Sequence, residues 1–484
     1  MPLPFKLPYT VAGLLLLGLA ASCGSKDSPD PAPRPPVLPP VTTGPSQVAL
    51  WTTTSDKGAL FYKSTLSINF GEPKGQNPTI DVDTTQTYQT IDGFGYTLTG
   101  GSAQLLNKMS TTARAALLKE LFATDGNNIG TSYLRISIGA SDLDASVFTY
   151  NESSLPDPTL AKFSIAPDKE NLIPVLKEIL AINPSIKILG SPWTAPTWMK
   201  TNNSFVGGSL KPEYYSAYAQ YFVKYLQAMQ AEGIRVDAIT LQNEPLHDAN
   251  NPSMLMTEAE QATFIRDNVG PALQAAGLNT KIILYDHNLD RPDYPISILR
   301  DPQARQYVDG SAFHLYKGEI SAMTTVHNAA PDKNVYFTEQ WTESTGKFAG
   351  DFTWHISNLI IGATRNWSRN VLEWNLASDQ NYGPHTPGGC TTCIGAVTIE
   401  GNTVTRNTAY YTIAHAAKFV RPGSVRIATN VPGTLPNVAF KNPEGKKVLI
   451  VLNTGSSLQT FDIRYRGKVA TGQLAAGAVG TYIW

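Results

Sequence analysis

Two glutamates follow short apolar segments in a way that suits acid and nucleophile chemistry on an acetal. Glu244 ends one such segment directly after Asn243, and Glu339 follows another, Val335–Thr338. In a retaining mechanism one carboxylate attacks the anomeric carbon, while a second carboxyl protonates the leaving oxygen and later deprotonates water. We predict that Glu339 is the nucleophile, that Glu244 is the acid/base about 5–5.5 Å away, and that Asn243 binds the sugar 2-hydroxyl. For either glutamate alone, the alternative is a surface residue at the start of a loop.

The elements that must position these glutamates alternate along the chain. Between about residues 90 and 420, short β-rich runs are separated by longer amphipathic stretches, which is typical of a parallel sheet with helical crossovers. Eight such units predict an α/β fold, a (β/α)8 TIM barrel, whose active site lies at the C-terminal ends of the strands. Glu244 and Glu339 then stand at the tips of the fourth and seventh strands. The predicted strands are Ile91–Thr97, Tyr133–Ile138, Ile186–Ser191, Val236–Gln242, Lys281–Tyr285, Ser311–Leu315, Val335–Thr338 and Val371–Asn375, and the predicted helices are Ser102–Phe122, Lys169–Ile182, Pro212–Ala231, Thr257–Ala276 and Trp354–Arg365.

A second, smaller domain is predicted from the two ends of the chain. After Arg421 the pattern changes to short strands separated by Gly, Pro and Asn, which indicates a β-sandwich. These strands are few for a stable domain, so we expect the strand-rich residues 47–88 to join the same sheets. The barrel would then occupy residues 89–420 and the C-terminal part of the β-sandwich residues 421–484.

The N-terminal segment is predicted to be an export signal followed by a lipid attachment site. Val11–Ala21 is an apolar run too short to span a bilayer but of the length of a signal-peptide core. Leu19–Cys23 resembles the bacterial lipobox, so we expect residues 1–22 to be a signal peptide and Cys23 to be lipidated. Residues 23–46, rich in Pro, Ser and Asp, would form a flexible tether. Because Gly24 rather than Asp follows the cysteine, we predict a lipoprotein of the outer membrane or cell surface; the alternative is an ordinary cleavage site and a periplasmic or secreted protein.

Charge and composition exclude several classes of function. The 38 basic and 39 acidic side chains nearly cancel, so no basic stripe is available for nucleic acid. The 7 His show no metal-ligand spacing of the H-E-x-x-H kind, and no Gly-rich phosphate loop opens a helix. We therefore expect no metal and no cofactor. We also expect a monomer that meets the membrane only through its N-terminal lipid anchor.

Two further cysteines, Cys390 and Cys393, lie in a Gly- and Thr-rich loop. A C-x-x-C pair suggests redox or metal chemistry in a cytosolic chain. Here no second Cys pair or cluster of His completes a zinc site. In an exported protein we expect instead a disulfide that pins the loop.

The chain resembles glycoside hydrolase family 30 from about Gln89 to its C-terminus. The resemblance implies a (β/α)8 barrel fused to a β-sandwich, Glu244 as acid/base and Glu339 as nucleophile. No single motif is specific, but the whole set occurs in the order found in the family. The motifs are Asp92-Gly93-Phe94-Gly95, Leu134–Asp142, Ser191–Lys200, Asn243-Glu244-Pro245, His314-Leu315-Tyr316, Thr338-Glu339 and Trp374-Asn375-Leu376.

The same resemblance implies roles for side chains around the two glutamates. Arg135 is expected to orient the nucleophile or to neutralise charge near it. Asp142 and Trp193 would bind the outer hydroxyls of the sugar. Tyr316 would stand within reach of the nucleophile, and Trp374 would form a stacking platform. His314 would line the same pocket.

Each of these residues has a structural alternative. Arg135 could pair with any carboxylate of the barrel, and His314 could be a core histidine with satisfied hydrogen bonds. Trp193 and Trp374 could be packing aromatics. The glycines of residues 92–95 are interpreted as structural, because glycine permits a tight backbone there.

The substrate is predicted from one loop. Tyr382–Cys390, with its paired cysteines, looks most like the β-1,6-glucanase branch of the family, whereas the glucosylceramidase branch lacks this pair. A lipoprotein at the cell surface also suits a polymer too large to import. We therefore predict hydrolysis of β-1,6-glucan of the pustulan type. The alternatives are an exo-acting β-glucosidase or glucosylceramidase, a transglycosylase, and a non-catalytic glycan-binding surface lipoprotein.

Overall fold

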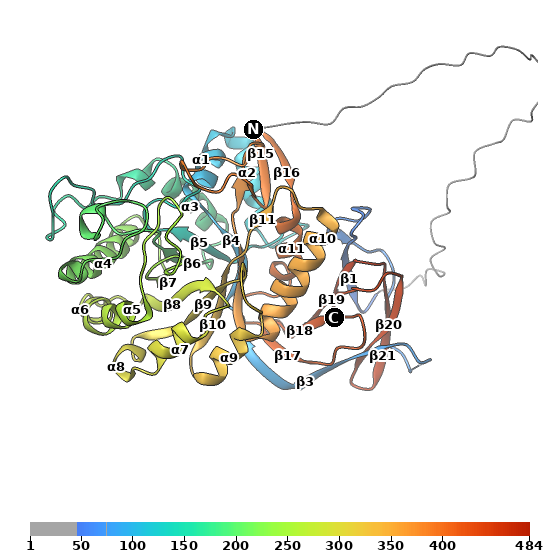
Figure 1. Ribbon diagram of the computed structural model, residues 1–484. Coiled ribbons are helices and arrows are strands. Elements are labelled where there is room, and N and C mark those ends of the chain that lie inside the picture. Colours follow the sequence, from blue (N-terminus) through green and yellow to red (C-terminus); the bar gives the residue numbers. More distant parts are fainter. Residues whose placement is uncertain (1–45, 74) are drawn as a thin grey trace, which may run out of the picture. The chain divides into compact units, whose positions relative to one another are not determined.

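Eight parallel strands close into a barrel in the computed structural model, which describes residues 46–73 and 75–484 (Figure 1). They are the eight strands predicted from the sequence, with ends that differ by a few residues. The prediction of a (β/α)8 barrel is therefore confirmed. Around the barrel the order is β10 (Asn334–Glu339), β12 (Ser368–Glu373), β4 (Gly93–Thr97), β5 (Tyr133–Ser137), β6 (Lys187–Ser191), β7 (Ala238–Thr240), β8 (Lys281–Asn288) and β9 (Val308–His314).

Inward-pointing side chains fill the barrel. One of the eight strands, β4, contributes a glycine in place of a side chain. This residue, Gly95, is the register partner of Tyr133 and Leu372. A Cβ at Gly95 would lie 1.8 Å from the Tyr133 carbonyl oxygen, so only glycine fits at this close approach. The other seven strands contribute one buried residue each to the interior cluster: Tyr133, Leu189, Ala238, Ile283, Ala312, Tyr336 and Leu372.

The first predicted helix, residues 102–122, is divided in two. The structure has α1 (Gly100–Lys108) and α2 (Thr111–Phe122) in its place. Ser110 separates them, because its side chain accepts a hydrogen bond from the Ala113 N–H and so caps α2. The hydrophobic pattern continues through this break and therefore does not reveal it.

The predicted helix over residues 257–276 is also interrupted. It consists of α5 (Glu258–Phe264), a π-helical turn and α6 (Gly270–Ala275). The turn ends beside Pro271, which has no N–H to continue an α-helical ladder. The remaining helices are α3 (Leu172–Ile182), α4 (Tyr215–Ala231), α7 (Asp293–Leu299), α8 (Pro302–Arg305), α9 (Ala322–Ala329), α10 (Phe348–His355) and α11 (Thr408–Ala417).

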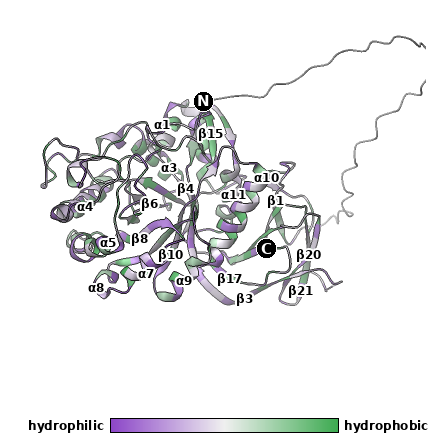
Figure 2. Ribbon diagram, viewed as in Figure 1, coloured by the Kyte–Doolittle hydropathy of each residue, from purple (hydrophilic) through white to green (hydrophobic). Residues whose placement is uncertain are grey.

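The outer helices turn one apolar face to the barrel. In α4 the residues Tyr218, Phe222, Tyr225 and Met229, spaced three or four apart, are all fully buried. Figure 2 shows hydrophobic and hydrophilic residues together on these helices, as expected for elements with one buried and one exposed face.

The second domain is a β-sandwich built from both ends of the chain, as predicted. Strand β3 joins its layers, because one end pairs in parallel with β20 and the rest pairs antiparallel with β17. The strand order is β2 (Tyr62–Lys63), β1 (Ala49–Thr53), β22 (Val479–Ile483), β19 (Lys447–Leu452), β18 (Asn437–Lys441), β17 (Val425–Thr429), β3 (Thr79–Thr90), β20 (Gln459–Tyr465) and β21 (Lys468–Leu474).

Strand β21 is not among the strands predicted after Arg421, which are Val425–Ala428, Val438–Lys441, Lys447–Leu452, Gln459–Tyr465 and Val479–Trp484. Gly472 in its middle weakens the strand pattern, since glycine has low strand propensity. The structure shows why glycine stands there: an added Cβ would lie 2.9 Å from the Tyr482 hydroxyl and 3.0 Å from the Phe461 ring. The close packing that makes this strand part of the sandwich is the same feature that hides it in the sequence.

The predicted signal peptide, the lipidated Cys23 and nearly all of the predicted tether lie outside the described residues. Within the described part of the chain, no helix combines the length and the apolar character needed to cross a membrane.

Candidate active site

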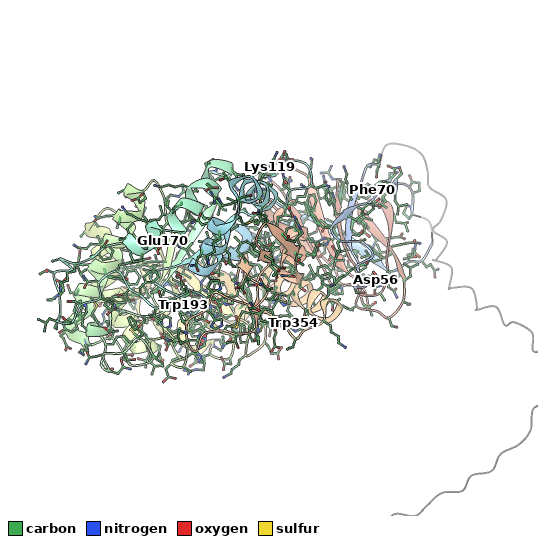
Figure 3. The ribbon with its side chains drawn as sticks, turned by 90° about the horizontal axis from the view of Figure 1, so that it is seen from above. Asp56, Phe70, Lys119, Glu170, Trp193 and Trp354 are labelled. Atoms are coloured by element: carbon green, nitrogen blue, oxygen red, sulfur yellow. A yellow bond between two sulfur atoms is a disulfide. The ribbon has the colours of Figure 1, made fainter. Side chains whose placement is uncertain are left out.

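A cavity of about 810 Å³ opens at the C-terminal ends of the barrel strands. Seven of the nine predicted catalytic and substrate-binding residues line it. The other two, Arg135 and His314, are fully buried and hydrogen-bond to residues that do. Figure 3 shows Trp193 among the side chains of the barrel. The seven lining residues are Asp142, Trp193, Asn243, Glu244, Tyr316, Glu339 and Trp374.

Glu244 stands on the loop directly after β7 in an unusual backbone conformation. Its φ is +46°, a value rare for residues with a side chain, and its N–H donates to the Asp286 carbonyl oxygen at 3.0 Å. Its Oε1 lies 3.2 Å from His314 Nδ1 and 3.5 Å from His287 Nδ1. Burial raises the pKa of Glu244, but these two imidazoles outweigh burial and hold that pKa well below its usual range.

Glu339 ends β10 and is held at both oxygens. Arg135 Nη1 donates to Oε2 at 2.5 Å, and the Tyr316 hydroxyl donates to Oε1 at 2.9 Å. A carboxylate fixed in this way cannot rotate away from the cavity. Its predicted role as a nucleophile requires this orientation, because attack needs the reacting atoms aligned.

The two glutamates share one histidine, which limits their separation. His314 Nδ1 lies 3.2 Å from Glu244 Oε1 and 3.7 Å from Glu339 Oε1. The two carboxyl oxygens are therefore at most 6.9 Å apart. The spacing of about 5–5.5 Å between the carboxyl groups of retaining glycosidases is compatible with this limit.

Asp286, which sequence analysis missed, is the centre of the hydrogen-bond network below the cavity. It is 0% exposed. Its Oδ2 accepts from Arg135 Nη2 and the Thr240 hydroxyl, both at 2.8 Å. Its Oδ1 accepts from the Thr338 hydroxyl at 2.7 Å and faces His314 Nε2 at 3.1 Å. Burial raises the pKa of Asp286, but the Arg135 charge and the bonds from His314 and Thr338 hold it well below its usual range.

His314 is therefore more than a core histidine. Burial lowers its pKa, but the charge of Glu339 and the contacts with Asp286 and Glu244 outweigh burial and raise it to about 9. Because Glu244 and His314 are in contact, their protonation is coupled, and the pair holds a proton at neutral pH. A general acid needs such a proton close to the leaving oxygen.

Arg135 links the nucleophile to the sugar-binding side of the site. Besides its ion pairs with Glu339 and Asp286, it donates to Asn243 Oδ1 at 2.6 Å. This bond leaves the Asn243 NH2 group as the donor on the cavity wall, where it was predicted to meet a 2-hydroxyl. The alternative of an incidental buried ion pair does not account for this arrangement.

One side of the cavity is aromatic. The rings of Trp193 and Trp374 stack with centroids 5.4 Å apart, and the Arg135 guanidinium lies 4.8 Å from the Trp193 ring centroid. Trp341, two residues after Glu339, also lines the cavity and was not predicted. The aromatic faces are thus both packing groups and cavity wall.

Asp142 is held by the loop that carries the cysteines. Cys390 and Cys393 form a disulfide, and the Cys390 N–H donates to Asp142 Oδ2 at 3.2 Å. Cys393–Ile394 (β14) pairs with Thr342–Glu343 (β11), just after Glu339. Burial and the charge of Glu339 raise the pKa of Asp142 to about 7. The loop therefore positions a carboxyl on the aromatic side of the cavity.

The other side of the cavity is polar and charged. It is formed by the loops after β7, β8 and β9, which are consecutive in the barrel and adjoin Glu244. Most lining residues of this side are polar or charged, and those that were not predicted are Leu246, His247, Asn250, Tyr285, His287, Asn288, Asp290, Arg291 and Lys317.

Comparison with known proteins places these features in one family. The family 30 glycosyl hydrolase TIM-barrel domain matches residues 91–420, and the family 30 β-sandwich domain matches residues 423–482. Endo-1,6-β-D-glucanase neg1 of Aspergillus fumigatus is 36% identical over 84% of this chain and 87% of its own length. Putative glucosylceramidase 2 of Caenorhabditis elegans is 31% identical over 83% and 81%. Among solved structures, the endo-β1,6-glucanase BT3312 is 37% identical with a TM-score of 0.84, covering 90% of this chain and 99% of its own.

Proposed function

The chain belongs to glycoside hydrolase family 30, and from this premise we propose that it hydrolyses β-1,6-glucosidic bonds in glucans with retention of configuration. The observation that carries this proposal is the buried cluster in which Glu244 and Glu339 share His314 at the open end of the barrel. A relative and a solved structure that are both named endo-1,6-β-glucanases, at 36% and 37% identity, support the bond that is cleaved.

The reaction proceeds in two displacements. Glu339 attacks the anomeric carbon, while Glu244 passes the proton that it shares with His314 to the leaving oxygen, so a glycosyl ester forms as the glycosidic bond breaks. Water then enters, Glu244 takes its proton, and attack on the ester restores the Glu339 carboxylate and the β configuration. Arg135 and Tyr316 hold the nucleophile throughout, and Asn243 contacts the sugar beside it.

The charged side of the cavity favours a sugar over a lipid as leaving group. The acid/base Glu244 marks the side on which the leaving group departs, and the loops beside it carry Asp290, Arg291 and Lys317. Such groups hydrogen-bond hydroxyls, whereas an acyl chain placed there would desolvate charges without compensation. The aromatic side, with Trp193, suits the apolar face of the sugar ring.

A cell-surface location is the second part of the proposal. We infer from the lipobox-like Leu19–Cys23 that the mature protein is a lipoprotein, tethered by residues 23–46 to the bacterial outer membrane. A monomer on such a tether could reach a polymer that is too large for import. Labelling of the cells with a radioactive fatty acid tests this part: the wild-type protein should be labelled and the Cys23→Ala variant should not.

Product analysis tests the reaction. Residues 24–484, which contain every described residue, are incubated separately with pustulan, laminarin, gentiobiose and a glucosylceramide. We expect gentio-oligosaccharides from pustulan, with the β-anomer detected first by NMR. Glucose released only from gentiobiose or the glucosylceramide would contradict glucan cleavage and support an exo-acting β-glucosidase or glucosylceramidase. Products that lengthen when an acceptor sugar is added would indicate transglycosylation.

A further inference from the structure

One buried nitrogen beside the acid/base lacks a hydrogen-bond partner among the described residues. It is Nδ1 of His287, a residue that is 7% exposed and lies near the end of β8, next to the register shift in that strand. Its nearest carboxylate oxygen is Glu244 Oε1 at 3.5 Å, which is longer than an ordinary hydrogen bond. A buried polar atom without a partner needs an explanation, and a role as a metal ligand is one.

The surrounding atoms have the spacing of a metal site. Glu244 Oε1, His287 Nδ1 and His314 Nδ1 all lie within 4.8 Å of one another. These three atoms form a triangle. Glu244 Oε1 lies 3.2 Å from His314 Nδ1 and 3.5 Å from His287 Nδ1. In tetrahedral Zn²⁺, with bonds of about 2.0–2.1 Å, neighbouring ligand atoms stand about 3.3–3.4 Å apart. Both distances are therefore close to those around a tetrahedral ion, and the third, between the two histidine nitrogens, is at most 4.8 Å.

The outer contacts of this cluster also fit a metal site. His314 Nε2 faces Asp286 Oδ1 at 3.1 Å, so the carboxylate holds the ring with Nδ1 directed at Glu244. A histidine oriented by a carboxylate behind it is the usual arrangement in zinc sites. Two imidazoles and one carboxylate suit Zn²⁺, whereas Ca²⁺ and Mg²⁺ prefer oxygen ligands alone.

From this geometry we infer that Glu244, His287 and His314 form a binding site for Zn²⁺, with the fourth position open to the cavity. Zn²⁺ would bond the oxygen that Glu244 uses as acid and base and would displace the proton held between Glu244 and His314, which leaves to solvent. The occupied enzyme cannot protonate a leaving group. Inhibition rests on the proposed function, but metal binding does not.

Cobalt provides a readout that is independent of activity. The tag-free chain from residue 24 is titrated with Co²⁺, and the visible absorption of four-coordinate Co²⁺ is recorded. We expect one equivalent to bind and to be displaced by Zn²⁺. Zn²⁺ should inhibit hydrolysis of an aryl β-glucoside competitively, and a chelator should restore the rate. Absence of the cobalt spectrum, or Zn²⁺ inhibition that does not compete with substrate, would overturn the inference.

Two histidine variants locate the site. His287→Ala removes one ligand, and we expect Co²⁺ to bind at least about a hundredfold more weakly, because even outer contacts of a metal site contribute about 10–100-fold. His247→Ala is the matched control, since His247 lines the same cavity outside the ligand triangle. Equal weakening by both variants, or none by His287→Ala, would contradict the assignment. Cobalt binding in a protein that cleaves no glycoside would leave this inference standing and remove the proposed function alone.

Discussion

Replacement of Asp286 by asparagine should disturb the orientation of the catalytic glutamates while leaving both glutamates in the protein. Asp286 contacts Arg135 and His314 but does not line the cavity, so it acts on the reaction only through them. Asparagine keeps the volume, removes the charge and replaces one acceptor oxygen by an NH2 group. That NH2 would face groups that are themselves donors. Both Glu244 and Glu339 would remain in place, but with a weakened support.

The size of the effect follows from the buried ion pair. Arg135 Nη2 and Asp286 Oδ2 are 2.8 Å apart with both side chains fully buried, which corresponds to about 6 kcal/mol of Coulomb energy at an effective dielectric constant of 20. Breaking a buried pair by removing one partner costs about 3–5 kcal/mol of unfolding free energy. Because Glu339 still pairs with Arg135, we expect about 3 kcal/mol. Displacement of the nucleophile and acid/base by about 1 Å should lower kcat by about 10²-fold.

Two assays measure these effects. Urea unfolding followed by tryptophan fluorescence gives the stability change, and steady-state hydrolysis of an aryl β-glucoside gives kcat and KM. Asp309→Asn is the control, because Asp309 pairs with Lys281 at the opposite end of the barrel. It should lower stability and leave kcat unchanged. If Asp286→Asn kept kcat within twofold of the wild type, or lost no more kcat than the control, the proposed positioning role of Asp286 would be refuted.

Three further predictions concern the glutamates and a buried aspartate. Glu339→Gln should lower kcat by several orders of magnitude without loss of folding, and near-normal turnover in a purified, folded sample would rule out its role as nucleophile. Glu244→Ala should be rescued by azide to give the β-glycosyl azide, because azide needs no base; NMR detection of the α-azide would mean that the two roles are exchanged. Burial raises the pKa of Asp168 to about 8, from about 3.9 in the unfolded chain. The folded state therefore binds this proton more tightly, and the resulting stability, complete below about pH 4, is lost as the pH rises towards 8, by about 1.4 kcal/mol per pH unit. Asp168→Asn should flatten this decline in urea unfolding between pH 5 and 8, and an unchanged slope would contradict the assignment.

The sequence predicted the barrel well because its signal is local. Each strand is a short apolar run, and the position directly after a strand marks the active face, which identified both Glu244 and Glu339. The same rule applied to Asp286, one residue after the fifth predicted strand, but no neighbouring residue suggested its role. Its partner Arg135 lies 151 residues away, and a contact at that separation depends on how the strands are arranged in space.

The sequence also did not predict a break within one helical region or a strand that contains a glycine. The separation of α1 from α2 depends on one hydrogen bond that the Ser110 side chain accepts from the Ala113 N–H, and the hydrophobic pattern does not reveal it. Strand β21 contains Gly472, whose small size is needed by Tyr482 and Phe461 in the folded state. In both cases a tertiary or capping contact overrides the local preference.

The β-sandwich has a consequence for the order in which the protein folds as it is synthesised. Strands β1 to β3 are synthesised first, but the strands that pair with β1 and β3, namely β17, β20 and β22, are synthesised much later. Until then β3, twelve residues long, has no ladder to join, and such long-range pairing is slow and prone to aggregation. The barrel, whose strands pair with near neighbours along the chain, can close in the meantime and hold both ends close together. Completion of the sandwich therefore requires β22, and a polypeptide that stops before β22 would expose the unpaired edges of β1 and β19.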